Sequence, residues 1–190
     1  MKKIWFVTGN ANKFRELSVI ASKYNVTFEM APLKGIEPQA DSLEFIASFC
    51  AEEASKTLGE PLVVEDSGLF IDALKGFPGV YSSYVYKTIG CEGILKLMKD
   101  VSNRRAFFKA VVAYWSPELP EVKLFTGICQ GRISDSIRGS QGFGFDPIFI
   151  PESREETFAQ MSREEKSLYS HRYLAFSSFL QWLCSDNRKL

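Results

Sequence analysis

The sequence predicts an α/β fold: a mixed β-sheet with flanking helices, in one domain. Two observations lead to this fold class. Short apolar runs typical of buried strands alternate with helical patterns through the first half of the chain, and two long runs rich in aromatic and β-branched residues follow them. A chain of 190 residues has the size of one domain, with room for two lobes, and can bury a substantial core.

The first half of the chain predicts a strand, a helix, a second strand and a second helix. Residues 4–7 form an apolar run that is too short for a helix, and residues 13–24 place their apolar side chains on one helical face. Residues 26–31 predict the second strand. Residues 43–58 predict the second helix, which we expect to end at Gly59.

The second half predicts two long strands that run antiparallel to each other. Residues 61–69 predict a strand that runs into a loop at its acidic residues, and residues 88–100 predict a helix. The runs at residues 105–115 and 122–128 predict the two long strands, and the turn residues between them are typical of a strand connection.

Two signals near the C-terminal end predict helices. Ser162 and Glu165 have the spacing of a capping box, in which each side chain accepts a backbone N–H of the other residue. The final helix shows a stripe that we expect to be buried: Tyr173, Phe176, Leu180 and Leu183. The chain has 16 phenylalanines, so aromatic packing should dominate the core.

Charge and cysteine content argue against several classes of protein. The chain has 23 basic and 23 acidic residues, which argues against a nucleic-acid-binding protein with a broad basic surface. Its four cysteines are far apart and form no CxxC pair, which indicates reduced thiols rather than a zinc site or a disulfide framework. The apolar stretch at the start is too short for a signal peptide, and no run approaches the roughly 20 apolar residues of a membrane span. We expect a cytoplasmic protein without nucleic-acid or membrane partners.

The stretch TGNANKF, residues 8–14, joins the first strand to the first helix. Loops at the carboxyl ends of strands are where open α/β sheets bind ligands. The start of the helix would present backbone N–H groups to an anion, and Lys13 adds a full positive charge. The spacing matches neither a dinucleotide fingerprint nor a Walker A loop. The stretch is therefore either a phosphate site or a capped turn.

Three acidic residues are candidates for a metal site. Glu65 and Asp66 follow an apolar strand, and Glu37 lies in a loop after another strand. Two adjacent carboxylates that are short of solvent need a compensating cation or donor. Mg²⁺ suits them because it takes hard oxygen ligands and keeps several waters. The alternatives are an ordinary acidic start to a loop for the pair, and a solvated charge for Glu37.

The stretch GSQGFGFDPIF, residues 139–149, could bind a planar base. Glycines alternate there with Phe143 and Phe145, and Asp146 follows. Aromatic faces can stack on a base, and a carboxylate can accept a hydrogen bond from a ring N–H. The alternative is a glycine-rich turn whose phenylalanines pack into the core.

The stretch EEKSLYSHRYLAF, residues 164–176, holds the only histidine of the chain, His171, next to Arg172 and five residues after Lys166. The fork of an arginine suits a carbonyl oxygen or a phosphate. A lone histidine can equally be structural. Taken together, these stretches supply a phosphate cradle, metal-competent acids, an aromatic slot and a cationic clamp. Those are the parts of a nucleotide hydrolase that has no covalent nucleophile.

Four stretches, in this order, resemble the inosine triphosphate pyrophosphatase family and especially its archaeal members: TGNANKFRE, VEDSGLFIDALKGFPGVYSS, GFGFDPIF and REEKSLYSHR. The resemblance implies an elongated α/β fold with two lobes around a substrate cleft, and a homodimer. It implies Mg²⁺-dependent hydrolysis of non-standard purine nucleoside triphosphates (ITP, dITP and XTP) to the monophosphate and pyrophosphate. Water would attack the α-phosphorus, and the reaction would cleanse the nucleotide pool.

The resemblance also implies roles for single residues. Asp66 would accept the proton of the attacking water and bind the metal together with Glu37, and Ser67 would bind the substrate beside Asp66. Glu65 is a further candidate ligand from the carboxylate pair alone. The residues that would hold the triphosphate are Thr8, Gly9, Asn10, Ala11, Asn12 and Lys13. The residues that would bind the base are Phe143, Gly144, Phe145, Asp146, Lys166, His171 and Arg172.

One segment departs from the family pattern. Many members carry Asn and Lys in the helix after the metal-binding glutamate, whereas this segment has no lysine before Lys56. Two rival functions stay open: a related pyrophosphatase that acts on modified pyrimidine or standard triphosphates, and a nucleotide sensor without catalysis. A 6-keto oxygen can accept from His171 or Arg172, whereas a 6-amino group would leave such donors unpaired at a cost of roughly 1–3 kcal/mol each. We therefore expect adenine to be rejected.

Overall fold

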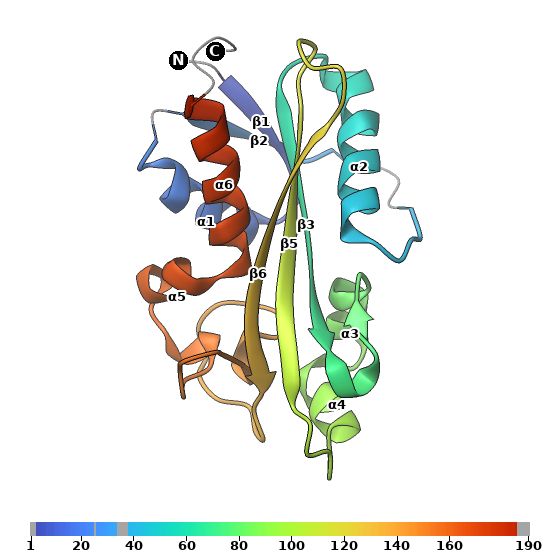
Figure 1. Cartoon of the computed structure of the whole chain (residues 1–190), viewed down its shortest axis with the longest axis vertical. Coiled ribbons are helices and arrows are strands. Elements are labelled where there is room, and N and C mark those ends of the chain that lie inside the picture. Colours follow the sequence, from blue (N-terminus) through green and yellow to red (C-terminus); the bar gives the residue numbers. More distant parts are fainter. Residues whose placement is uncertain (1–2, 25, 34–37, 186–190) are drawn as a thin grey trace. The chain divides into compact units, whose positions relative to one another are not determined.

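The computed structural model describes residues 3–24, 26–33 and 38–185 and shows a mixed α/β fold (Figure 1). The strands are β1 (Lys3–Val7), β2 (Thr27–Ala31), β3 (Leu62–Ile71), β4 (Pro78–Gly79), β5 (Arg105–Trp115), β6 (Lys123–Ile133) and β7 (Phe149–Pro151). The helices are α1 (Ala11–Ala21), α2 (Leu43–Leu58), α3 (Ser82–Thr88), α4 (Gly90–Leu97), α5 (Arg163–Tyr169) and α6 (His171–Ser185). Short 3-10 helices are η1 (Asp72–Leu74), η2 (Asp146–Ile148) and η3 (Phe158–Gln160). The predicted fold class is confirmed.

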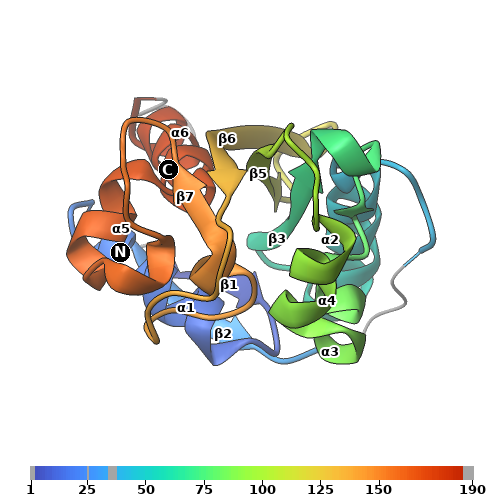
Figure 2. The ribbon, with the colours of Figure 1, turned by 90° about the horizontal axis from the view of Figure 1, so that it is seen from below.

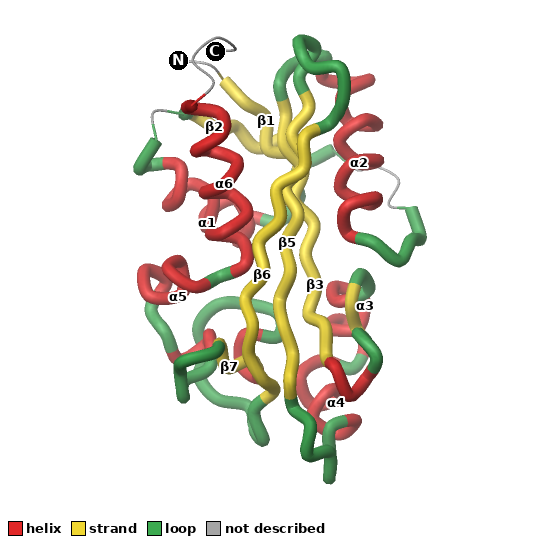
Figure 3. Tube along the Cα trace, in the orientation of Figure 1, coloured by secondary structure: helices red, strands yellow, loops and turns green. Residues whose placement is uncertain are grey.

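The strands form one seven-stranded sheet in the order β2-β1-β3-β5-β6-β7, with β4 paired to β3 (Figure 3). β1 runs parallel to both β2 and β3, with Val7 opposite Ala31 on one side and opposite Val64 on the other. β7 runs antiparallel to β6. Parallel neighbours need a crossover connection, and α1 supplies it between β1 and β2. The end of β1 at Val7 therefore lies beside Val64 of β3, and the candidate residues follow Val7 and Val64 directly.

The chain divides into two compact units. The first unit takes in Met1–Asp66, Ala110–Gly127 and Arg172–Leu190, and the second takes in Ser67–Lys109 and Ile128–His171. Each unit has a hydrophobic core of its own. β3, β5 and β6 each contribute residues to both units, so the division runs through strands rather than through a linker.

The core of the first unit packs α1 and α6 against the sheet. Phe6 on β1 meets Phe176 on α6 edge to face, with ring centroids 5.5 Å apart, and Leu17 on α1 is fully buried beside them. The buried stripe predicted for the final helix is confirmed at Phe176, Leu180 and Leu183, whereas Tyr173 is only half-buried. Figures 1 and 2 show α2 on the other side of the sheet from α1 and α6.

The core of the second unit is also rich in aromatic side chains. Phe108 on β5 packs against Phe149 on β7, with ring centroids 4.6 Å apart, and Phe158 on η3 completes this group. Ile94 on α4 and Leu69 on β3 are fully buried in the same cluster. Aromatic packing therefore dominates both cores, as the phenylalanine content predicts.

Local signals predicted several elements at their observed bounds. α2 spans Leu43–Leu58, begins at an Ser42 cap whose side chain accepts the N–H of Phe45, and ends at Gly59 with a left-handed φ of 63°. β5 spans Arg105–Trp115 as predicted. The capping box of Ser162 and Glu165 is present at the start of α5.

Other elements differ from their predictions. β3 does not end at its acidic residues but continues through Ile71, because Leu69 and Ile71 bury their side chains in the second core and Leu69 pairs with Gly79 of β4. The helix predicted at 88–100 is α4, which begins at Gly90, whose φ of 61° separates it from α3. α3 was not predicted, since its sequence is rich in β-branched and aromatic residues.

The boundaries of two further elements also differ from their predictions. α1 begins at Ala11 and ends at Ala21, so it starts two residues earlier and stops three residues earlier than predicted. β6 continues to Ile133, because Gly131–Ile133 pair with β7.

No helix among the described residues is long and apolar enough to cross a membrane.

Candidate active site

The loop between β1 and α1 is a capped turn. Asn10 is the cap of α1, and its side-chain oxygen accepts the N–H of Asn12 at 2.9 Å and of Lys13 at 3.3 Å. The N–H of Asn10 in turn donates to Oγ1 of Thr8 at 3.1 Å. The capping alternative left open by the sequence is therefore correct for the conformation of the loop. It does not exclude an anion, because the cap and the loop lie at the exposed surface.

Gly9 occupies the middle of this loop without a packing reason. It is exposed, and a Cβ added there would meet nothing within 4 Å. The protein itself therefore leaves space above the backbone at this position.

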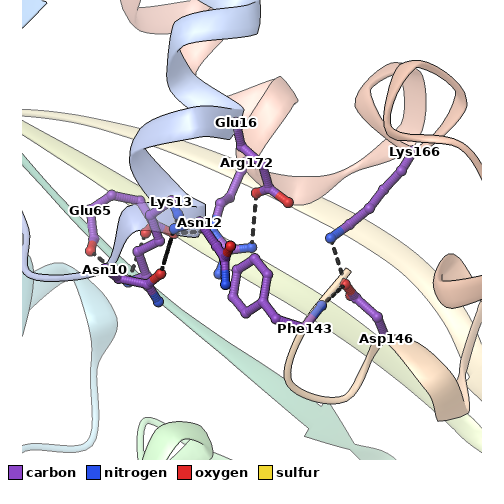
Figure 4. Close-up of polar contacts among 9 residues, drawn as sticks. All are labelled: Asn10, Asn12, Lys13, Glu16, Glu65, Phe143, Asp146, Lys166 and Arg172. Atoms are coloured by element: carbon purple, nitrogen blue, oxygen red, sulfur yellow. Dashed lines mark hydrogen bonds and ion pairs between the residues drawn. The ribbon is translucent and has the colours of Figure 1, made fainter. Parts of the chain in front are cut away.

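Lys13 is held against Glu65 (Figure 4). Its Nζ lies 2.8 Å from Oε2 of Glu65 and donates to the backbone carbonyl of Glu65 at 3.1 Å. The Lys13 side chain is 17% exposed and that of Glu65 is 0% exposed. The charge that the sequence predicted for this loop is thus present, and it is fixed by a buried partner.

Arg172 approaches the same carboxylate from α6. Its Nε lies 3.1 Å from Oε1 of Glu65, and its Nη1 lies 3.2 Å from Oε2 of Glu16 on α1 (Figure 4). The structure therefore brings Lys13, Glu65 and Arg172 together in the first unit. The structure shows Arg172 against two carboxylates, and its predicted contact with the base stays a prediction.

Glu65 does not fit the metal role for which it was a candidate. Each of its carboxylate oxygens has a cationic group within 3.1 Å, and a divalent cation at the same oxygens would be repelled by Lys13 and Arg172. Successive side chains of a strand also point to opposite faces of the sheet, so Glu65 and its neighbour Asp66 on β3 do not share one face. The expected repulsion between these two carboxylates is therefore relieved by the strand itself.

Of the two described acidic candidates, Glu65 and Asp66, Asp66 is the one that could bind a metal. It is half-buried within β3, and Ser67 follows it, also half-buried. Residues 3–24, 26–33 and 38–185 contain no group of three or more acidic, histidine or cysteine side chains that could hold a metal ion. Mg²⁺ needs no such cage, because it binds through one or two carboxylates, substrate phosphates and water. Asp66 fits this mode; Glu37 lies outside the described residues.

The second unit holds another buried ion pair, between Lys166 on α5 and Asp146 on η2. Nζ of Lys166 lies 2.7 Å from Oδ2 of Asp146, and the same oxygen accepts the N–H of Phe143 at 2.9 Å (Figure 4). The two side chains are 7% and 4% exposed. Nζ also lies 5.1 Å from the ring centroid of Phe143, within cation–π range.

Gly142 is essential to this arrangement. Its φ is 75°, and a Cβ added there would lie 2.0 Å from Oδ2 of Asp146. The next residue but one, Gly144, also has a positive φ of 63°, but a Cβ there would meet nothing within 4 Å. The backbone of the loop therefore passes against the carboxylate at Gly142 only by virtue of the missing side chain.

The two phenylalanines of this loop have different surroundings. Phe143 is half-buried, whereas Phe145 is 3% exposed and meets Tyr86 edge to face with ring centroids 5.4 Å apart. Phe145 belongs to the core of the second unit. The alternative of a turn anchored in the core thus describes Phe145, and Phe143 remains the candidate for stacking on a base.

His171, the first residue of α6, is 1% exposed. Its ring stacks on Phe108 with centroids 4.6 Å apart and an angle of 11° between the ring planes. This packing fixes the plane of the imidazole. His171 therefore makes a packing contact of the kind expected if it is a structural residue, which was the alternative left open by the sequence. It lies in the same unit as Asp146 and Lys166.

The two buried cysteines, Cys91 and Cys129, show no activation. Burial, followed by the charge of Asp146, raises the pKa of Cys91 to about 11, and burial raises that of Cys129 to about 12. A thiol with such a pKa stays protonated near neutral pH and is a poor nucleophile. All four cysteines are free of disulfides, with Cys50 and Cys184 half-buried. The prediction of reduced thiols agrees with this arrangement.

Two residues of these clusters were not singled out from the sequence. Glu16 lies inside the stretch TGNANKFRE, three residues after Lys13, but nothing in its spacing indicates the contact with Arg172. Gly142 was noted as one of several glycines, and only the structure shows that Asp146 lies against it.

The chain is similar to known proteins over almost its whole length. The sequence model of the Ham1 family matches residues 4–182. The chain is 49% identical over 180 residues to a dITP/XTP pyrophosphatase of Methanopyrus kandleri, with 95% of each chain covered. It is 47% identical over 181 residues to a dITP/XTP pyrophosphatase of Pyrococcus horikoshii, with 95% and 96% covered.

Solved structures agree with these relatives. The Ham1 protein of Staphylococcus aureus is similar with a TM-score of 0.85 and 32% identity, over 98% of this chain and 100% of that one. The Ham1 protein of Coxiella burnetii gives a TM-score of 0.87 with 29% identity, over 97% and 100%. The resemblance stated from four sequence stretches is confirmed. The chain belongs to the Ham1 family.

Proposed function

We propose that the protein hydrolyses non-standard purine nucleoside triphosphates, namely ITP, dITP and XTP, to the nucleoside monophosphate and pyrophosphate, with Mg²⁺ as cofactor. It is a hydrolase that acts on phosphoric anhydrides, as its relatives are. The observation that carries the proposal is its 47–49% identity, over about the full length of both chains, to proteins known as dITP/XTP pyrophosphatases.

The first unit offers the groups for the triphosphate. The loop Thr8–Lys13 lies at the start of α1, where the helix dipole favours an anion. The open space above Gly9 would admit a phosphate close to the backbone. Lys13 adds a cation whose position is fixed by Glu65. These features support triphosphate binding.

Asp66 is proposed as the proton acceptor. The oxygen of a water bonds to the α-phosphorus, and the bond from that phosphorus to the bridging oxygen breaks. The bridging oxygen leaves with the β- and γ-phosphates as pyrophosphate, and Asp66 takes the proton of the water. Mg²⁺, held by Asp66 and Glu37, would acidify the water and neutralise phosphate charge. Ser67 would orient the substrate beside Asp66.

The second unit offers the groups for the base. Phe143 supplies a half-exposed ring for stacking, on a loop that Asp146 and Lys166 hold in place. A 6-keto oxygen would accept a hydrogen bond from His171, whose ring plane is fixed by Phe108. The proposed contact of Arg172 with the base would require Arg172 to leave Glu65 or Glu16. A 6-amino base would leave a buried donor unpaired, which costs roughly 1–3 kcal/mol, or about tenfold to a hundredfold in affinity.

The substrate claim is tested by incubating the purified protein with XTP, dITP, ITP, GTP and ATP, with Mg²⁺ and with EDTA. We expect pyrophosphate from XTP, dITP and ITP, none in EDTA, and turnover of ATP lower by about tenfold or more. Orthophosphate as the first product, or turnover of ATP and GTP equal to that of XTP, would contradict the proposal.

Two further expectations belong to this proposal, a homodimer and a location in the cytoplasm. Light scattering of the purified protein would give the mass of the assembly, and a mass near 21.5 kDa at micromolar concentration would contradict the dimer.

A further inference from the structure

We propose that Glu65 is a positioning residue, which holds Lys13 in place for the reaction, and that it does not bind the metal. Its kinetic readout rests on the proposed function.

The geometry of Glu65 fits a two-sided support. Oε2 contacts Nζ of Lys13 at 2.8 Å and Oε1 contacts Nε of Arg172 at 3.1 Å. Nζ of Lys13 also donates to the backbone carbonyl of Glu65 at 3.1 Å. Lys13 is thus held at two points by one residue. A lysine in water samples many rotamers, and these two contacts select one of them.

Three elements meet at this carboxylate. Glu65 lies on β3. Lys13 on α1 is 52 residues from it along the chain, and Arg172 on α6 is 107 residues from it. Glu16, also on α1, closes the group by its contact of 3.2 Å with Nη1 of Arg172. The four charged side chains of this group are two cations and two carboxylates, so they compensate one another. The position of Lys13 therefore depends on the docking of the C-terminal helix of its own unit.

The Glu65 carboxylate needs its two cationic partners because it is buried. The side chain of Glu65 is 0% exposed, so its charge is stable there only while both cations stay in place. The same burial fixes the cations in turn, because removal of Glu65 would leave Lys13 and Arg172 to repel each other. A group in this position controls where Lys13 directs its charge.

A removal of the negative charge at Glu65 acts on substrate binding in two opposing ways. It lessens the repulsion of an incoming triphosphate, and it releases Lys13 from its fixed position. The first effect strengthens binding in the ground state and the second weakens it, so the two oppose each other in KM. The second effect also lowers the rate, since the catalytic geometry is lost. We therefore expect an effect on kcat and little effect on KM.

The test compares Glu65→Gln with the wild type, using XTP as substrate over a series of Mg²⁺ concentrations. We expect kcat to fall about tenfold to a hundredfold while KM changes less than about threefold. The half-saturating Mg²⁺ concentration should stay within about twofold, since no metal ligand is lost. A kcat within twofold of the wild type, or activity restored by excess Mg²⁺, would overturn the proposal.

A second comparison separates positioning from general damage to the fold. In a Lys13→Met background, Glu65→Gln should lower kcat no further, because the group that it positions is already absent. Independent, multiplicative losses would overturn the proposal. The matched control is Glu29→Gln, which removes an exposed ion pair with Lys3 in the same unit, and should leave kcat unchanged.

If Glu65→Gln does not fold, Glu65→Asp retains the charge with a shorter reach; it should give a kcat between those of wild type and Lys13→Met, and a raised Mg²⁺ requirement would overturn the proposal. If the wild type hydrolyses no nucleotide, the proposed function fails, and the ion pair is tested by unfolding. Lys13→Met and Glu65→Gln should then be coupled by about tenfold or more in the unfolding equilibrium constant, and additive effects would overturn the proposal.

Discussion

Lys166 and Asp146 form a buried ion pair, with Nζ 2.7 Å from Oδ2, and this pair fixes the loop that carries Phe143. The same Oδ2 also accepts the N–H of Phe143. The Asp146 carboxylate therefore holds both the Lys166 ammonium and the backbone that carries the Phe143 ring. The two charges lie 20 residues apart along the chain, on η2 and α5. Their burial makes the pair sensitive to the loss of either partner.

Lys166→Met should destabilise the protein, because it leaves the Asp146 carboxylate buried without its cation. Loss of one partner of a buried pair costs about 3–5 kcal/mol in the free energy of unfolding. Urea denaturation of the two proteins measures the difference. Lys56→Met is the control, since it removes an exposed pair with Glu53 and should cost less than about 1 kcal/mol. Equal losses for both variants would contradict the role given to the buried pair.

Gly142→Ala should destabilise the protein more than Gly144→Ala. Both positions have a positive φ, which costs an alanine about 1–2 kcal/mol. Only the methyl group at position 142 would also collide with Asp146, and such crowding adds about 1–3 kcal/mol. Thermal unfolding of the two variants side by side measures the excess. The account is wrong at this point if the two melting temperatures agree.

Asp66→Asn should abolish most of the activity without loss of stability. Replacement of the carboxylate by an amide removes the proposed proton acceptor and a proposed metal ligand, and a general base contributes about 10²–10⁴ in rate. We expect kcat with XTP to fall by about this factor, and urea denaturation to show an unchanged midpoint. Asp72→Asn, on the exposed η1 segment, is the control and should keep full activity. Retention of more than a tenth of the activity by Asp66→Asn would contradict the role of Asp66.

Stability should fall at alkaline pH partly through Cys91. Its pKa is raised from 9.0 to about 11 in the folded protein, so the folded state retains the thiol proton where the unfolded state loses it. The resulting stabilisation is complete below pH 9 and is lost as the pH rises toward 11. Cys91→Ala should therefore show a smaller fall in melting temperature than the wild type between these two pH values. Parallel curves for the two proteins would contradict the assignment.

Elements whose signals are local could be predicted from the sequence. α2 was predicted at its observed bounds because a capping serine and a left-handed glycine define its two ends within a few residues. The buried stripe of α6 repeats with helical spacing, so its face could be recognised without a partner. The four stretches that carry the family resemblance led to the correct family because each is a continuous run of sequence, which can be recognised without knowledge of distant contacts.

Features that depend on distant contacts could not be predicted. β3 continues past Asp66 because Leu69 pairs with β4 and enters a core formed by residues far along the chain. Glu65 looked like half of an acidic pair, since no spacing shows that Lys13 and Arg172, 52 and 107 residues away, contact its two oxygens. Phe143 and Phe145 differ by two positions, and only the packing of Tyr86 separates the core residue from the candidate base platform.

The central claim is that water attacks the α-phosphorus of a non-standard purine triphosphate, with Asp66 as the acceptor of its proton. The direct measurement is hydrolysis of dITP in H₂¹⁸O with Mg²⁺, followed by mass spectrometry of both products. We predict that the label appears in the nucleoside monophosphate and that pyrophosphate carries none. Label in the pyrophosphate, or in orthophosphate released first, would contradict the account.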